Sequence, residues 1–186
     1  MSRSLLLGDA RLRAAALALS IVGVEYARVV AGRLPGMAVP ALLFGGLALC
    51  LFALGRTSSE LGLGRDRLPA RLLGGVALGA VLLLPAMVRW GGGPQLPLDL
   101  AVAAIAVSVG EEAAFRGALF AALEVFGPLP AVLGSTAVWT AAHALSHPPT
   151  FLPAVAAAGL LLGAWRWACR DLVGPALGHV LADLAL

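Results

Sequence analysis

Long apolar runs follow one another along the whole chain, separated by short polar or proline- and glycine-rich connections. The runs cover residues 14–31, 36–55, 70–90, 98–123, 128–147, 151–168 and 172–186. A helix needs about 20 apolar residues to cross the hydrocarbon core of a bilayer. The breaks at Pro35-Gly36, at residues 91–94 and at Pro148-Pro149 are typical of loops between helices. The pattern therefore predicts an all-α, polytopic integral membrane bundle of about seven transmembrane helices.

The composition supports a membrane protein of one domain. Hydrophobic residues make up 60% of the 186 residues and charged residues 12%, whereas soluble domains average roughly 45–50% and 25%. This balance excludes a water-soluble enzyme and a disordered chain. Cys50 and Cys169 are the two cysteines, and they are too few for a disulfide scaffold.

The charge pattern indicates an orientation and does not indicate a nucleic-acid site. All 13 basic residues are arginines, and most of them lie between apolar runs and not in one patch. They concentrate before the first run, between the second and third runs, and near the sixth and seventh runs. The positive-inside rule then predicts a cytoplasmic N-terminus, retained as a first helix, and an external C-terminus. The Lys-free, Ala/Arg/Gly-rich composition favours a bacterial protein, and thus the inner membrane.

Ionisable residues inside the apolar runs are the candidates for function, because a charge in the bilayer costs at least ~2.5–3.5 kcal/mol. The fourth run contains Glu111, Glu112 and Arg116. Glu112 and Arg116 stand four residues apart and are expected to pair on one helix face. Glu111 points about 100° away from Glu112 and has no partner within its own helix. A buried carboxylate of this kind is a candidate general base.

The three histidines of the chain all lie in the fifth and seventh runs. His179 and Asp183 are four residues apart, so the acid is expected to orient the ring. His143 follows Trp139 by one turn, and the indole is expected to pack on the imidazole. His147, beside Pro148, is expected at the membrane interface.

Two further groups are interpreted as boundary features. Glu25 and Arg28 predict a local pair at the end of the first run. Trp165, Arg166 and Trp167 are typical of an interfacial belt.

The spaced polar residues of the fourth, fifth and seventh runs resemble the motifs of the CPBP family of intramembrane proteases. This family includes CaaX-processing and bacteriocin-processing proteins. The family's Glu-Glu-x-x-x-Arg is similar to residues 111–116, its Phe-x-x-x-His to Trp139–His143, and its His-x-x-x-Asn/Asp to His179–Asp183. The departures are Trp139 in place of Phe and Asp183 where prenyl-protein proteases often carry Asn. The resemblance covers about residues 98–186, which are predicted to form the catalytic core, with residues 1–97 supplying N-terminal helices and linkers.

The resemblance implies hydrolysis of a peptide bond in a membrane-embedded or lipidated protein or peptide. Carried over, Glu111 and His143 activate a water, His179 and Asp183 stabilise the oxyanion, and Glu112 and Arg116 support the site or hold the substrate. A mechanism without a cofactor is favoured. The alternative is zinc bound by Glu111, His143 and His179 with an open fourth position.

Two other functions fit intramembrane acids and histidines. One is a proton-coupled transporter, although no paired repeat with broken helices is evident. The other is a non-catalytic membrane scaffold. The depths of the residues also conflict with the protease interpretation: at ~1.5 Å per residue, Glu111 is expected ~20 Å below the outer end of its helix and His143 only ~6 Å below.

Overall fold

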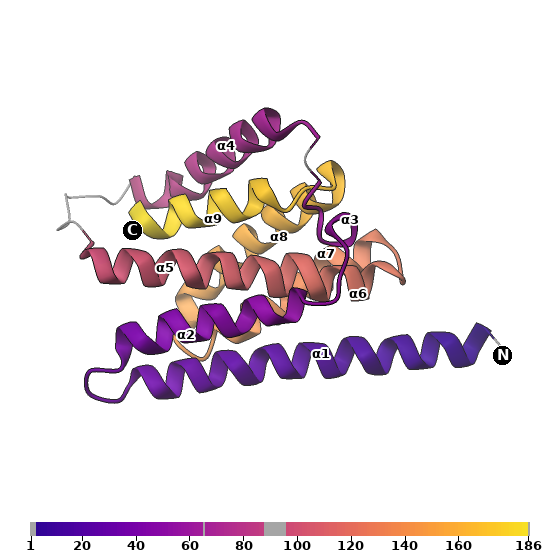
Figure 1. Cartoon of the computed structure of the whole chain (residues 1–186), viewed down its shortest axis with the longest axis horizontal. Helices are drawn as coiled ribbons and strands as arrows, with labels where there is room; N and C mark the ends of the chain where they lie inside the picture. Colours follow the sequence, from indigo (N-terminus) through magenta and orange to yellow (C-terminus); the bar gives the residue numbers. More distant parts are fainter. Residues whose placement is uncertain (1–2, 65, 88–95, 186) are drawn as a thin grey trace.

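The protein is an all-α bundle in which helices run back and forth along one common direction (Figure 1). The computed structural model describes residues 3–64, 66–87 and 96–185, and no strand occurs among them. The elements are α1 Arg3–Gly32, α2 Ala38–Cys50, α3 Ser58–Leu61, α4 Leu68–Met87, α5 Leu98–Glu111, α6 Phe120–Glu124, α7 Pro128–His143, α8 Leu152–Cys169 and α9 Val173–Ala185, with the short helices η1 Leu51–Ala53, η2 Glu112–Leu119 and η3 Pro149–Phe151.

Most predicted runs correspond to helices, and the differences have local causes. The first helix begins at Arg3, well before the predicted residue 14, because the polar residues 9, 11 and 13 lie on exposed or partly exposed positions of α1. The fifth run ends as a helix at His143 and not at His147, since the chain turns over residues 144–147 before two prolines. The predicted loop at 91–94 lies outside the described residues.

Helix length alone does not establish seven membrane crossings. Two helical segments are long and apolar enough to span a bilayer, Gly8–Gly32 and Pro149–Cys169. Ala38–Ala53, Leu68–Leu84 and Val173–Ala185 are apolar but shorter.

The fourth run is one continuous helical rod with an irregular middle. It passes from α5 into η2, a π-helical segment, and then into α6. Such segments are rare and frequently occur at functional sites. The sequence pattern predicts the rod but carries no signal for the π-helical turn.

Glycines allow the central helices to approach closely. α2 packs along α5, and α4 packs along α9. A Cβ atom on Gly110 would lie 2.1 Å from the Gly46 carbonyl oxygen, and one on Gly178 would lie 2.8 Å from Leu78 Cβ. Small residues are common where helices cross in lipid. The contact of Gly46 with Gly110 brings α2 against the turn of α5 that carries Glu111.

Arg166 is part of the core and not of an interfacial belt, so this prediction was wrong for that residue. Its side chain is 1% exposed. It donates to the carbonyl oxygens of Arg116 at 3.1 Å and Glu60 at 2.7 Å. Arg166 therefore joins α8 to the π-helical segment and to α3, whereas Trp167 remains exposed.

Candidate active site

The two adjacent acids Glu111 and Glu112 are both buried and point to different neighbours. Glu111 is the last residue of α5 and faces α1 and α7, while Glu112 begins the π-helical segment and faces α9. The polar cluster therefore has two halves, one around each acid.

Glu111 has partners from two other helices. Trp139 Nε1 donates a hydrogen bond of 2.7 Å to Glu111 Oε2, and Arg28 Nη2 lies 3.3 Å from Glu111 Oε1. His143 Nε2 is 4.0 Å from Glu111 Oε2. The expectation that Glu111 lacks a partner within its own helix holds, but tertiary packing supplies an arginine and an indole.

His143 presents one ring nitrogen to this acid. Its Nδ1 is 3.0 Å from the carbonyl oxygen of Trp139; because a carbonyl only accepts, Nδ1 donates, and Nε2 is left facing Glu111. The Trp139 ring lies 4.5 Å from the imidazole with an interplanar angle of 65°. The predicted packing of Trp139 on His143 is confirmed.

The second half of the site is centred on Glu112. Its Oε1 accepts from Arg116 Nη1 at 2.9 Å, which confirms the predicted pair, and faces His179 Nδ1 at 3.0 Å. His179 Nε2 is 3.4 Å from Asp183 Oδ2, as the spacing of four predicts. Ser108, which the sequence interpretation missed, donates to the same Asp183 oxygen at 2.7 Å.

Trp139 joins the two halves. Its ring centroid lies 5.5 Å from that of His179, and the Arg116 guanidinium carbon lies 4.1 Å from the indole centroid. Four of the six predicted site residues thus contact Trp139, and Glu112 and Asp183 are joined to them through His179. His179, however, contacts Glu112 and not Glu111.

The predicted conflict in depth was wrong, because depth has to be counted from the turn between α6 and α7. Glu111 precedes Glu124 by 13 residues, and His143 follows Pro128 by 15 residues. At ~1.5 Å per residue, both positions lie about 20 Å from that turn. The two helices run in opposite directions, so the residues meet at one level.

Glu25 and Arg28 of α1 also belong to the site, although the sequence pattern placed them at a boundary. They form the predicted ion pair, but Glu25 is 2% exposed and Arg28 reaches Glu111. The available signal was an acid and a base three residues apart within an apolar run. Nothing in the sequence indicated that this pair faces α5.

One comparison with known proteins identifies the family. The family model described as type II CAAX prenyl endopeptidase Rce1-like matches residues 93–185, half of the chain, including all of α5 to α9. The chain belongs to the Rce1-like family of type II CAAX prenyl endopeptidases. It is a peptidase that acts on protein, and the proteins of this family are membrane proteins. The resemblance to CPBP proteases is confirmed, and membership favours the peptidase over the transporter and scaffold alternatives.

No curated protein and no solved structure matches the chain.

In this endopeptidase the arrangement of donors does not fit the three-ligand zinc alternative. Zinc ligands lie about 2 Å from the metal, so three of them must converge on one point. His179 instead faces Glu112 with Nδ1 and Asp183 with Nε2. Over residues 3–64, 66–87 and 96–185, no three His, Cys, Asp or Glu side chains converge in this way.

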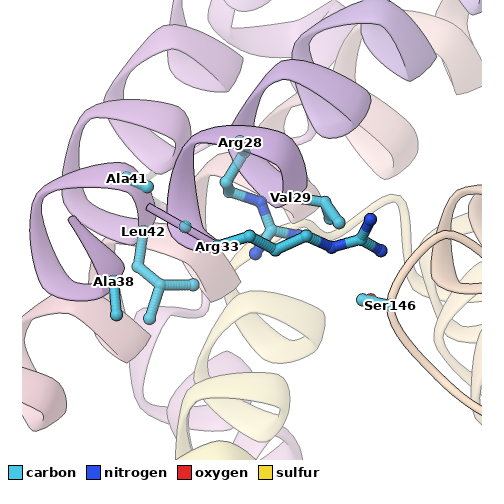
Figure 2. A pocket seen from close by; sticks show the side chains of 8 residues that line it. Arg28, Val29, Arg33, Ala38, Ala41, Leu42 and Ser146 are labelled. Atoms are coloured by element: carbon cyan, nitrogen blue, oxygen red, sulfur yellow. The ribbon is translucent and has the colours of Figure 1, made fainter. Parts of the chain in front are cut away.

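A pocket of about 310 Å³ adjoins the Glu111 half of the site in the Rce1-like chain. Arg28 lines it together with apolar residues of α1 and α2, and Figure 2 shows Arg33 reaching toward the segment that carries Ser146. Arg33 Nη2 is 3.4 Å from the Leu145 carbonyl oxygen there. The pocket therefore reaches the surroundings of the site from the α1–α2 side.

Proposed function

We propose that this protein is an intramembrane endopeptidase that hydrolyses a peptide bond of a membrane-embedded or lipidated protein. The observation that carries the proposal is the separation of 4.0 Å between Glu111 Oε2 and His143 Nε2. This gap is too long for a direct hydrogen bond and is suited to one water held by both groups. Both groups come from helices inside the segment that the family model matches.

In the proposed mechanism Glu111 is the general base. It takes a proton from the water as the water oxygen attacks the scissile carbonyl carbon, while His143 Nε2 orients the water. When the C–N bond breaks, Glu111 returns this proton to the leaving amine, so that a carboxyl and an amino terminus are formed.

The second half of the site is assigned to the oxyanion. The contact of 3.4 Å between His179 Nε2 and Asp183 is long for a hydrogen bond, so Nε2 is the ring atom that can donate to a substrate oxygen. Glu112, which is paired with Arg116, binds Nδ1 and holds the ring in place. Hydrogen-bond donors aimed at a developing oxyanion commonly contribute a factor of about 10²–10³ to kcat.

We also propose about seven crossings, made by α1, α2, α4, the α5–α6 rod, α7, α8 and α9. These helices run between the same two ends of the bundle (Figure 1), and large apolar side chains such as Leu19, Phe44 and Leu73 are exposed on the outside. The connection from α2 to α4 and the connection from α8 to α9, whose sequences contain Arg56, Arg67 and Arg170, lie at the end that holds the N-terminus (Figure 1). This supports a cytoplasmic N-terminus; bacterial origin and the inner membrane stay predictions.

The division of the chain into an N-terminal part and a catalytic core, residues 1–97 and 98–186, remains a proposal. α5 to α9 carry the three motifs, while α1 and α2 cover the Glu111 side of the site. The substrate class to test first is a protein with a prenylated cysteine in a C-terminal CAAX sequence, because the family model is described as a CAAX prenyl endopeptidase.

The test uses the protein in nanodiscs and an internally quenched peptide that carries a farnesylated cysteine four residues from its C-terminus. We expect Glu111→Gln to abolish cleavage, because an amide cannot accept the proton of the water. Glu124→Gln, which removes an acid from the remote pair with Arg170, is the matched control and should cleave normally. Cleavage by Glu111→Gln at the wild-type rate would overturn the proposal.

A further inference from the structure

α1 lies outside the segment matched by the family model, yet it supplies the cation that touches the candidate base. We propose that Arg28, held by Glu25, is a positioning residue that fixes the carboxylate of Glu111. This inference rests on the proposed function of Glu111.

The contacts around Glu111 bind its two oxygens separately. Arg28 Nη2 lies 3.3 Å from Oε1, and Trp139 Nε1 donates to Oε2 at 2.7 Å. Because one oxygen is bound from α1 and the other from α7, the carboxylate cannot rotate without breaking one contact. Oε2 is thereby kept on the side of His143.

Arg28 is itself held firmly. Its Nε lies 3.0 Å from Glu25 Oε2, and Nη2 forms an ion pair with the same oxygen. Glu25 is 2% exposed and the Arg28 side chain 13% exposed, so these interactions are screened little by solvent.

α2 is shaped to admit the arginine. A Cβ atom on Gly45 would lie 2.5 Å from Arg28 Cδ and 2.7 Å from Arg28 Cγ. The aliphatic part of Arg28 therefore passes directly over a glycine on its way to α5. A side chain at position 45 would force Arg28 off this path, which links the conformation of α2 to the orientation of Glu111.

The charges around Arg28 favour positioning over simple pairing. A pair of Glu25 and Arg28 alone would be neutral, and the guanidinium would need no second acid. Here one guanidinium faces two buried carboxylates, Glu25 and Glu111. Glu25 therefore holds Arg28, and Arg28 in turn contacts Glu111.

The experiment measures kcat and KM for the farnesylated peptide with the full chain in nanodiscs. We expect Arg28→Met to lower kcat at least tenfold with KM within about twofold, since binding of the remote parts of the peptide is unaffected. Arg28→Lys should recover most of the rate. Guanidinium ions should partly restore Arg28→Ala, because the pocket that Arg28 lines is open beside the site.

A double variant separates positioning from a merely structural role. Glu25→Gln with Arg28→Gln removes both charges of the α1 pair, so that no charge on α1 itself is left buried without a partner. If the pair only stabilises the fold, the double variant should return to the wild-type kcat. If Arg28 positions Glu111, kcat should stay at least tenfold low. Arg13→Met, an exposed position on the same helix, is the control and should not change kcat.

The two proposals fail in different ways. Loss of cleavage in Glu111→Gln together with wild-type kcat in Arg28→Met or in the double variant would overturn the role of Arg28 and leave the proposed function intact. Full cleavage by Glu111→Gln would overturn the proposed function and this inference with it, whereas no cleavage of the peptide by the wild-type protein would overturn the prenylated-cysteine substrate class.

Discussion

Trp139 donates a hydrogen bond of 2.7 Å from its indole nitrogen to Glu111 Oε2. The same ring lies against the imidazoles of His143 and His179. A phenylalanine, the residue that the family motif usually carries here, packs in a similar way but has no N–H group. In this chain the aromatic position of the motif is therefore also a hydrogen-bond donor to the candidate base.

Replacing Trp139 by Phe should lower kcat about tenfold. A hydrogen bond to a charged group contributes roughly 1.5–3 kcal/mol to stability. Only the part of this free energy that orients the Glu111 carboxylate affects kcat. Initial rates on the farnesylated peptide measure the effect. Trp167→Phe, at an exposed position, is the control; equal rates for both variants would show that the indole bond has no role.

Replacing Arg116 by Met should destabilise the protein by about 3–5 kcal/mol, because it leaves the buried Glu112 without its cation. Both side chains of this pair are 0% exposed. The free energy of unfolding in mixed micelles is the measurement. Arg170→Met removes the partner of Glu124 at an exposed site and should cost no more than about 1 kcal/mol; similar losses in both variants would contradict the prediction.

Replacing Gly110 by Ala should separate α2 from α5 and move the adjacent Glu111. The new Cβ would lie 2.1 Å from the Gly46 carbonyl oxygen, a backbone atom that cannot turn away. We expect a loss of about 1–3 kcal/mol in stability together with a marked loss of cleavage. In Gly23→Ala the added Cβ would meet nothing within 4 Å, so this variant should behave as wild type in both measurements.

Glu60 should make stability depend on pH through the capping box of α3. The backbone N–H and the hydroxyl of Thr57 donate to Glu60 Oε2 at 2.7 and 2.8 Å, and these bonds lower the pKa of Glu60 below its usual 4.5. Because the folded pKa is depressed, the stabilisation is complete above about pH 4.5 and is lost as the pH falls through the folded pKa.

The measurement is the unfolding midpoint from pH 7 to pH 3 for the wild-type protein and Glu60→Gln. The wild-type protein should be the more stable at pH 7, and the two midpoints should converge at the acid end. A constant difference across this range would contradict the prediction.

The apolar pattern and the spacing of the polar residues are enough to predict an all-α protein, its family and its local pairs of charged residues. Apolar runs long enough for a bilayer predict helices wherever they occur, because the backbone must satisfy its own hydrogen bonds in lipid. Spacing of four residues on a helix is a local property, so the pairing of Glu112 with Arg116 and of His179 with Asp183 could be predicted.

The neighbours of Glu111 depend on how the helices pack and could not be predicted from the sequence. Periodicity states which residues share a face of one helix but not which other helix covers that face. The contact from Arg28, 83 residues away, and the bond from Trp139 depend on how α1, α5 and α7 pack. The π-helical turn at residues 112–119 is likewise not indicated by the apolar periodicity. Glu111 and His143 lie at one level because both are about equally far from the turn between α6 and α7, which joins antiparallel helices.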